Sequence, residues 1–260
     1  MSLIGIDVSV HNGDIDWGKI ASQHIDFAII RAGYGHNNID SKAVQNILGC
    51  KNNHIPFGLY WFSYALSIEM VREEADFICD FADIYNPQYP ICYDWEYDSD
   101  SYAKLNNINI TNSTRTNFAK AFLERVEERG YCAMLYTNID YLNKGFDELR
   151  SKYPIWLAQW GVSTPTKQAA IWQYSCEGRL EGISTEVDMN VSKKDYTKYN
   201  ENKMDFFVKA SNEMWNKYTK LANEIIDGKY GNGETRKRRL REVGCDYELA
   251  QMFVNYILNG

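Results

Sequence analysis

Short runs of apolar and aromatic residues recur along the chain as far as residue 191, and polar segments separate them. Within each run the hydrophobic residues are continuous and do not alternate with polar ones, which is typical of parallel strands covered on both faces. The runs predict eight strands, at 2–9, 27–35, 57–65, 89–97, 131–137, 154–160, 169–175 and 186–191.

Helix-like segments lie between the first six strands, whereas the connections between the last three are too short for regular helices. Segment 113–129 carries Phe118, Phe122 and Val126 on one stripe and is followed by Gly130, which suits a helix C-terminus. Alternating strands and helices imply right-handed crossovers, and eight strands suggest closure. We therefore expect an α/β fold, an irregular TIM-like β5α5β3 barrel, with helices at 16–24, 40–53, 68–85, 113–129 and 139–151.

The last part of the chain predicts a separate helical unit. Residues 193–204 are polar and show no periodicity, so we interpret them as a linker between a barrel domain at 1–192 and a second domain at 205–260. That second domain contains an amphipathic stretch at 205–227 and two shorter helical segments, and is expected to be a small three-helix bundle.

Polar residues at the C-terminal ends of the strands are candidates for a site, because TIM-type barrels carry their active sites there. Four of them are acids: Asp7, Asp94, Glu96 and Asp188. On one strand Asp94 and Glu96 would share a face, with carboxylates roughly 6 to 7 Å apart. An isolated Asp-x-Glu is more often a loop pair satisfied by an arginine or water, so the pattern matters only together with the other strand ends.

The remaining residues at these ends are aromatic, amide or basic. Aromatic residues in barrel strands are more often core than binding walls, and the two glutamines could simply satisfy backbone groups. The candidates for substrate binding are Tyr34, Tyr60, Phe62, Tyr136, Trp156, Gln159, Gln173 and Tyr174, and Arg31, Tyr64 and Trp160 lie at the same ends.

Composition narrows the chemistry. The six cysteines and four histidines do not have the spacing of metal ligands, so we expect no metal and no cofactor. The net charge is −7, and residues 205–260 hold nine Lys or Arg against eight Asp or Glu, so the acidic excess lies in the barrel. An acidic barrel argues against nucleic acid as its ligand. Carboxylates are the chemistry that remains.

Neither a signal peptide nor a membrane span is expected. The first residues, MSLIGIDVSV, lack a basic stretch followed by a long apolar one, and no apolar run reaches the roughly eighteen residues of a membrane helix. Synthesis in the cytoplasm without membrane insertion is therefore the expectation.

Several motifs together carry a resemblance: GIDVSVHNGDIDW (5–17), FAIIRAGYG, FGLYWFSYA, YDWEYD, WLAQW, IWQYS and VDMN. Over about residues 3–192 the chain resembles glycoside hydrolase family 25, the Chalaropsis-type lysozymes of phages and bacteria. The resemblance implies cleavage of the β-1,4 bond between N-acetylmuramic acid and N-acetylglucosamine in peptidoglycan. Residues 221–258 resemble one copy of the Cpl-7 type of cell-wall-binding repeat.

The resemblance also implies residue roles. Glu96 matches the family's general acid, and a neighbouring carboxylate with an aromatic wall would raise its pKa as that task requires. Asp94 would be the ionised partner, with the substrate's own acetamido group attacking and configuration retained. Asp7 and Asp188 would support the oxocarbenium-like state by hydrogen bonding and charge.

The tail contains a glycine-rich turn, GKYGNG, followed by the basic run RKRRLR. A basic run is by default a solvated helix face, and it could also contact nucleic acid, but the resemblance favours binding to the cell wall. The glycines of the GKYGNG turn permit positive φ, and an arginine of the basic run could hold a peptide carboxylate. The expected wall-binding residues are Gly228, Tyr230, Gly231, Asn232, Gly233, Arg236 and Arg239.

The sequence thus predicts a two-domain endolysin with peptidoglycan as its partner. Release to the wall would require a holin-type permeabilising partner, and assembly of several chains through the C-terminal domain could replace the missing repeat copies. A bacterial autolysin with the same chemistry and a catalytically silent carbohydrate-binding protein are the alternatives.

Overall fold

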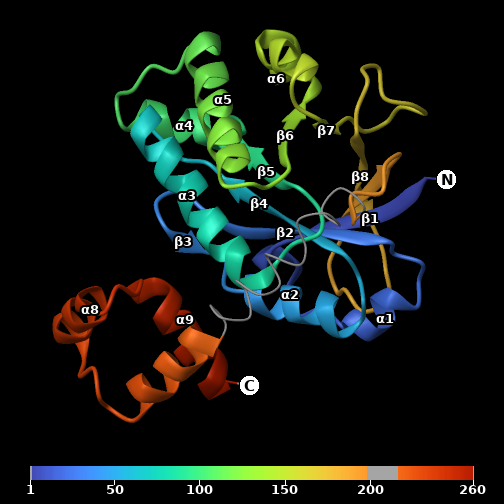
Figure 1. Ribbon diagram of the computed structural model, residues 1–260. Coiled ribbons are helices and arrows are strands. Elements are labelled where there is room, and N and C mark those ends of the chain that lie inside the picture. The colour runs from blue at the N-terminus through green and yellow to red at the C-terminus, as the bar shows by residue number, and fades with distance from the viewer. Residues whose placement is uncertain (1, 198–215, 260) are drawn as a thin grey trace. The chain divides into compact units, whose positions relative to one another are not determined.

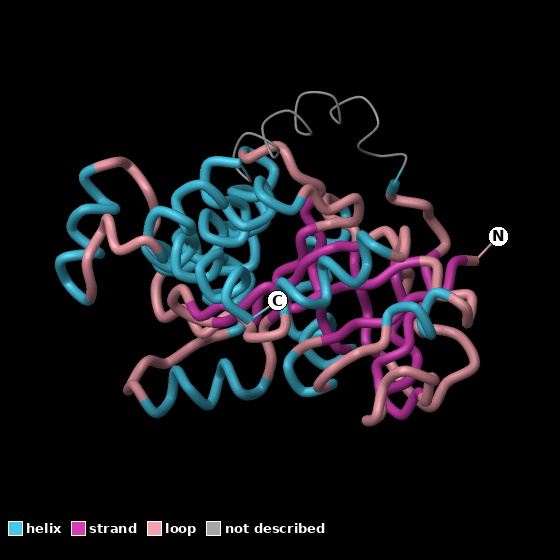
Figure 2. The backbone as a smooth tube through the Cα atoms, turned by 90° about the horizontal axis from the view of Figure 1, so that it is seen from below, coloured by secondary structure: helices cyan, strands magenta, loops and turns pink. Residues whose placement is uncertain are grey.

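The computed structural model describes residues 2–197 and 216–259, apart from a few side chains in the last helix. The chain divides into two compact units, a barrel and a C-terminal helical unit. Figures 1 and 2 show the barrel unit as a ring of strands with helices packed outside it.

Eight strands close into a barrel, as the hydrophobic pattern predicted. Their order around the barrel is β1-β9-β8-β7-β6-β5-β4-β2, and pairing between β1 and β2 closes the ring. A short strand that was not predicted, β3 (Asn38–Ile39), adds to the end of β2. The barrel strands are β1 (Leu3–Val8), β2 (Phe27–Tyr34), β4 (Phe57–Phe62), β5 (Ile91–Asp94), β6 (Ala133–Asn138), β7 (Ile155–Ala158), β8 (Ile171–Gly178) and β9 (Val187–Ser192).

The last strand departs from the expected parallel arrangement. β9 runs antiparallel to both of its neighbours, β8 and β1. The connection 179–186 explains this, because a parallel crossover needs a dozen or more residues and this loop is shorter. β9 therefore starts at the rim where the other strands end. Asp188, near its beginning, is paired in register with Asp7 of β1.

The five predicted helices are present, and the last of them is divided. The segment 139–151 forms α6 (Ile139–Lys144) and a 3-10 helix, η2 (Phe146–Ser151). Gly145 separates them, and a Cβ at this position would lie only 2.7 Å from Oγ1 of Thr116. The other four are α1 (Trp17–Ala21), α2 (Ala43–Asn52), α3 (Ile68–Tyr85) and α5 (Asn112–Glu128), and another 3-10 helix, η1 (Val10–Asn12), follows β1.

One helix, α4 (Tyr97–Leu105), was not predicted. The predicted fourth strand extended to residue 97, but β5 ends at Asp94 and α4 begins three residues later. The local signal was the pair of acids in the first helical turn, Asp98 and Asp100, because acids near a helix N-terminus are stabilised by its dipole.

Inside the barrel, an apolar floor gives way to a polar rim. Side chains two residues apart on a strand point to the same face, so each rim residue stands directly above a core residue of the same strand. The pairs are Ile29 and Arg31, Cys92 and Asp94, Met134 and Tyr136, and Ile171 and Gln173. The change from apolar to polar side chains along these strands puts the candidate site at this end of the barrel.

Within its described residues, the C-terminal unit contains helical residues at 216–226, α8 (Gly233–Glu242) and α9 (Tyr247–Asn259). Its buried residues include Tyr218, Leu240 and Phe253, and the rings of Tyr218 and Phe253 lie 5.6 Å apart. Residues 198–204 of the expected linker and 205–215 of the expected first helix lie outside the described residues. Across 2–197 and 216–259, no helix is both long and apolar enough to cross a membrane.

A buried acid stabilises the turn that follows β4. Glu74 of α3 is 2% exposed and accepts hydrogen bonds from the Ser63 hydroxyl (2.5 Å) and the Tyr64 backbone N–H (3.1 Å). Burial raises its pKa to about 8. The folded state therefore holds a proton that the unfolded state loses near pH 4.5, so stability falls as the pH rises from about 4.5 to about 8.

We predict that Glu74→Gln removes this pH-dependent loss, because the amide does not ionise. Its oxygen can still accept from the Tyr64 N–H, and its NH2 group can donate to the Ser63 oxygen. Thermal melts at pH 5 and pH 8 should differ by several degrees less in the variant than in the wild type. Glu73→Gln, an exposed neighbour on the same helix, is the matched control and should behave as wild type. Parallel melting curves for Glu74→Gln and wild type would contradict the assignment.

Candidate active site

The structure brings the four predicted acids to one rim of the barrel. Asp7 comes from β1, Asp94 from the end of β5, Glu96 from the start of α4 and Asp188 from β9. Their charges influence one another: Asp188 raises the pKa of Asp7 and of Glu96, and Glu96 and Asp7 raise the pKa of Asp94. They form one acidic cluster.

Asp7 is the buried anchor of this cluster. Its Oδ2 accepts hydrogen bonds from the side-chain amides of Gln173 (2.9 Å) and Asn190 (2.7 Å). Burial and the charge of Asp188 raise its pKa well above the usual range. Burial raises the pKa of Asp188 as well. A hydrogen bond between the two carboxyl groups adds to the rise at Asp7 and opposes it at Asp188, as expected when a close pair shares one proton.

Asn190 is a site residue that the sequence analysis missed. It is fully buried, and its Oδ1 accepts the indole N–H of Trp156 at 2.7 Å. An indole N–H can only donate, so this bond fixes the amide orientation and directs the Asn190 amide N–H toward Asp7. The available signal was spacing, because Asn190 follows Asp188 by two residues in VDMN.

Gln173 has a different place from the one expected. It is 2% exposed, and all of its polar atoms are engaged: Nε2 donates to Asp7, while Oε1 accepts from Trp160 Nε1 (3.2 Å) and from the Tyr136 hydroxyl (3.3 Å). The structure therefore assigns it to holding Asp7 and leaves it no open face for a sugar. Trp160 itself is 52% exposed.

Asp94 is 3% exposed, and its Oδ1 has no hydrogen-bond partner within the described part of the chain. Burial raises its pKa well above the usual range, and Glu96 and Asp7 add to the effect. Arg31 acts in the opposite direction and favours the ionised form. A buried carboxylate oxygen without a partner is costly unless a ligand supplies one.

Glu96 was expected to continue the strand of Asp94. In the structure it is instead the N-cap residue of α4, with an extended backbone conformation. Its side chain is only partly buried. Burial raises its pKa, and the charge of Asp188 adds to the rise. The Tyr136 hydroxyl partly offsets this when its single proton is donated to Glu96 and not to Gln173. A reachable carboxyl group with a raised pKa is suited to donate a proton near neutral pH.

Arg31 brings a positive charge to the rim. Its Nε donates to Asp40 at 2.7 Å, and the Asp40 carboxylate is fully buried. The guanidinium lies 5.5 Å from the ring centre of Tyr34, and Nη1 lies 3.5 Å from Nε2 of His11. This fixed cation offsets part of the repulsion within the acidic cluster.

Three of the predicted aromatic residues pack together inside the rim, edge to face. Tyr60 and Tyr136, both partly buried, pack edge-on against Trp156 with ring centres 6.0 and 4.6 Å away. Trp156 is 1% exposed and belongs to the core cluster. It therefore supports the two tyrosines from below and does not line an open wall.

Beside the rim lies an aromatic patch made of Tyr34, Phe62, Tyr64 and Tyr102. Tyr64 is central: its ring centre lies 5.1 Å from Phe62, 5.0 Å from Tyr102 and 6.5 Å from Tyr34. Tyr34 and Tyr102 are exposed. Tyr102 belongs to helix α4, which was not predicted, and it was therefore not among the candidates.

Two further candidates are located away from the acidic cluster. Tyr174 packs against Trp172 on the face of β8 opposite Gln173. The two rings are tilted, with centres 5.7 Å apart. Gln159 accepts hydrogen bonds from the backbone and hydroxyl of Thr166, so it holds the loop after β7. Among residues 2–197 and 216–259, no cluster of His, Cys, Asp and Glu has the arrangement of a metal site.

In the C-terminal unit, both predicted arginines hold the glycine-rich turn. Arg236 donates to the Gly231 carbonyl (3.0 Å) and to side-chain oxygens of Asn232 (2.9 Å) and Gln251 (2.8 Å). Arg239 donates to the carbonyl of Lys229 (3.0 Å), and the Tyr230 hydroxyl donates to Glu224 (3.4 Å). The predicted glycines have positive φ, at 83° for Gly228, 68° for Gly231 and 55° for Gly233.

Known proteins match both units. The model of glycosyl hydrolases family 25 matches residues 6–183, and that of the CW_7 repeat matches residues 219–258. Lysozyme M1 of Streptomyces globisporus is 30% identical over 198 residues, which are 72% of this chain and 66% of that lysozyme. The chain thus spans about two thirds of the length of this relative. An uncharacterised protein of Escherichia coli, YegX, is 25% identical over 197 residues, 72% of this chain and 68% of its own.

Solved structures agree with the fold. A bacterial lysozyme from Streptomyces coelicolor is 27% identical with a TM-score of 0.65, and the match covers 81% of this chain and 97% of that one. The CTP1L endolysin, 22% identical with a TM-score of 0.63 over 77% of this chain and 70% of its own, supports the fold alone. The resemblances read from the sequence are confirmed: this chain belongs to glycosyl hydrolases family 25 and carries a CW_7 repeat.

Proposed function

We propose that this family 25 hydrolase is a lysozyme that cleaves peptidoglycan between N-acetylmuramic acid and N-acetylglucosamine. The observation that carries the proposal is the acidic cluster at the carboxyl rim of a barrel that belongs to a glycosyl hydrolase family. Relatives that are named lysozymes support the cell wall as the substrate. A silent lectin would have little use for four mutually repelling acids.

Glu96 is the proposed general acid. Its partly exposed carboxyl group can reach a bound glycan, and its raised pKa keeps a proton available. Transfer of that proton to the glycosidic oxygen lets the leaving sugar depart with a hydroxyl group, while positive charge develops on the anomeric carbon.

Asp94 is proposed to act on the substrate's acetamido group. Its unpartnered Oδ1 would accept the acetamide N–H, which orients the acetamide oxygen for attack on the anomeric carbon. Arg31 favours the ionised state that this role requires. Glu96, ionised after its donation, then takes a proton from a water molecule, which attacks the anomeric carbon from the face that the leaving sugar vacated. The bond to the acetamide oxygen breaks, so the product keeps its configuration.

Asp7 and Asp188 are proposed to stabilise the developing positive charge. The pair shares a proton, so it carries negative charge at the rim without the full cost of two buried anions. Gln173 and Asn190 hold Asp7 in place for this purpose. The aromatic patch and the two rim tyrosines, Tyr60 and Tyr136, are proposed to stack against sugar rings.

The C-terminal unit is proposed to anchor the enzyme on the wall through its glycine-rich turn, with domains at 1–192 and 205–260 joined by a linker at 193–204. Since the chain has one CW_7 match, self-association through this unit would supply the avidity that repeated modules provide. Light scattering of the full chain tests this. A holin-type partner for release stays a prediction of the sequence.

We predict that Glu96→Gln lowers wall lysis by roughly 10²- to 10⁴-fold, because the amide keeps the shape and cannot donate the required proton. Turbidity loss of purified Gram-positive walls measures the rate, with Glu128→Gln, an exposed acid at the far end of α5, as the control. Mass spectrometry of the products should find N-acetylmuramic acid at the new reducing ends. Equal clearing by Glu96→Gln and wild type would refute the assigned acid, and reducing N-acetylglucosamine would refute the bond specificity.

We predict that Asp98→Asn shifts the alkaline limb of the pH–rate profile to lower pH. Asp98 is exposed, and its charge raises the pKa of Glu96, so its removal lets Glu96 lose its proton earlier as the pH rises. The shift should shrink in high salt because solvent ions screen an exposed charge. An unchanged limb at low salt would show that Glu96 does not govern it.

We predict that Arg236→Met weakens wall binding several-fold, because the turn loses the side chain that holds Gly231 and Asn232. Sedimentation with intact walls measures binding, in a Glu96→Gln background that prevents lysis. Arg238→Met is the matched control, since Arg238 is exposed and pairs only weakly with Glu242 at 3.7 Å. Equal losses in both variants would point to general charge attraction and not to the turn.

A further inference from the structure

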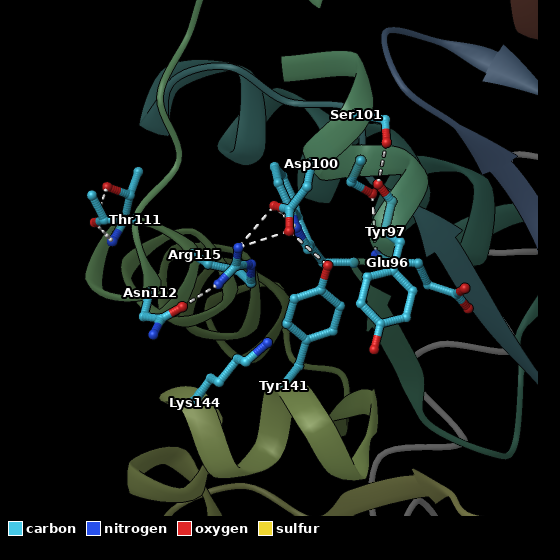
Figure 3. Close-up of polar contacts among 12 residues, drawn as sticks. Glu96, Tyr97, Asp100, Ser101, Thr111, Asn112, Arg115, Tyr141 and Lys144 are labelled. Atoms are coloured by element: carbon cyan, nitrogen blue, oxygen red, sulfur yellow. Dashed lines mark hydrogen bonds and ion pairs between the residues drawn. The ribbon is translucent and has the colours of Figure 1, made fainter. Parts of the chain in front are cut away.

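Asp100 lies in the first turns of α4, outside the acidic cluster, and three elements converge on its carboxylate (Figure 3). Nη2 of Arg115, from α5, donates to both oxygens at 2.9 and 2.8 Å. The hydroxyl of Tyr141, from α6, donates to Oδ2 at 2.6 Å. The indole N–H of Trp95 donates to Oδ1 at 3.0 Å. A charged acceptor with this many donors is held tightly.

These contacts secure the two residues on either side of Glu96. Trp95 is buried, its N–H is bound to Asp100, and its ring packs against Phe118 of α5. The ring of Tyr97 lies 5.0 Å from that of Tyr141. In Figure 3 the Glu96 carboxylate points away from this network, so the network restrains its backbone and leaves the carboxyl group itself untouched.

The other contacts of α4 lie near the surface: the Tyr97 hydroxyl donates to Asp140 at 3.1 Å, and the ring of Tyr102 lies 5.0 Å from that of Tyr64. α4 is short and polar, and its only buried residues are Ser99 and Ala103. Ser99 accepts the backbone N–H of Glu96 at 3.2 Å, which stabilises the cap but does not attach the helix to the barrel. Because α4 buries little apolar surface, the hydrogen bonds of Asp100 contribute much of its attachment to the barrel.

The network is also rigid in itself. Arg115 is buried, its Nη1 donates to Asn112 at 2.8 Å, and its guanidinium lies 4.6 Å from the ring centre of Tyr141. The planar guanidinium therefore has little freedom, and the opposite charges of Arg115 and Asp100 compensate each other at a poorly hydrated position.

We propose that Asp100, held by Arg115 and Tyr141, is a positioning residue that fixes the Glu96 carboxyl group at the rim through Trp95 and Tyr97. The inference rests on the proposed role of Glu96 as general acid. Its physical basis is that proton transfer requires a carboxyl group placed within about half an ångström of the productive position, and a shift of about 1 Å can cost roughly 100-fold in rate.

Tyr141→Phe is the decisive variant, because it removes one hydrogen bond to Asp100, keeps the ring beside Tyr97 and changes no charge. Tyr153→Phe is the matched control: its hydroxyl bonds Glu127 at the other end of α5, far from the rim. In the variant a less restrained Glu96 becomes more hydrated, so its pKa should move down toward 4.5. We expect a fall of roughly half a pH unit or more, and a drop of about 10-fold in kcat with KM nearly unchanged.

The first measurement is an NMR titration of isotope-labelled glutamate carboxyl groups in the full-length protein, with Glu96→Gln identifying the Glu96 signal. It needs no substrate, so it decides the positioning role even if no wall cleavage is found, which would count against the proposed function alone. The second measurement is steady-state kinetics on soluble glycan fragments. A merely structural role would lower the melting temperature and leave the Glu96 titration unchanged.

Arg115→Lys is the second variant, since it keeps the charge and loses the shared contact to both Asp100 oxygens; it should reproduce the shift. Agreement of both variants, against an unchanged Tyr153→Phe, supports the proposal. A Glu96 titration identical to wild type in either folded variant overturns it.

Discussion

The structure depends on one constraint, the burial of mutually repelling carboxyl groups at a single rim of the barrel. Poorly hydrated acids that repel one another cannot all ionise, so some of them keep their protons. The pKa values of Asp7, Asp94, Glu96 and Asp188 are all raised for this reason. A retained proton is what a general acid needs in order to protonate a glycosidic oxygen. Neighbouring groups decide where they reside, through the amides on Asp7 and the guanidinium of Arg31.

Two of the four acids, Asp7 and Glu96, are held by hydrogen-bond networks of neighbouring side chains. Trp156 orients the Asn190 amide and also carries the two rim tyrosines, so one buried indole links the apolar floor to the charged rim. On the other side of the rim, Asp100 restrains the residues around Glu96. Polar side chains in such networks are costly when unpaired, so satisfied networks give each carboxyl group a defined position.

In the proposed function, the barrel and the C-terminal unit both contribute to recognition of the cell wall. The barrel contributes the acidic cluster and an aromatic patch, both suited to a glycan, while the C-terminal unit presents a turn whose three glycines adopt positive φ. Arg236 and Arg239 stabilise that turn from within, so its backbone conformation is prearranged before any ligand arrives. Restraint of this kind lowers the entropy lost on binding.

The sequence by itself determined the eight strands, the closed barrel, the four acids and the family, because hydrophobic runs and motif spacing are local properties of the chain. Only the tertiary structure decided the buried positions of Trp156 and Gln173 and the hydrogen-bond partners of Asn190 and Asp100. These features depend on partners that are distant along the chain. Gln173 lies 166 residues from the Asp7 that it holds, and no local pattern encodes that contact.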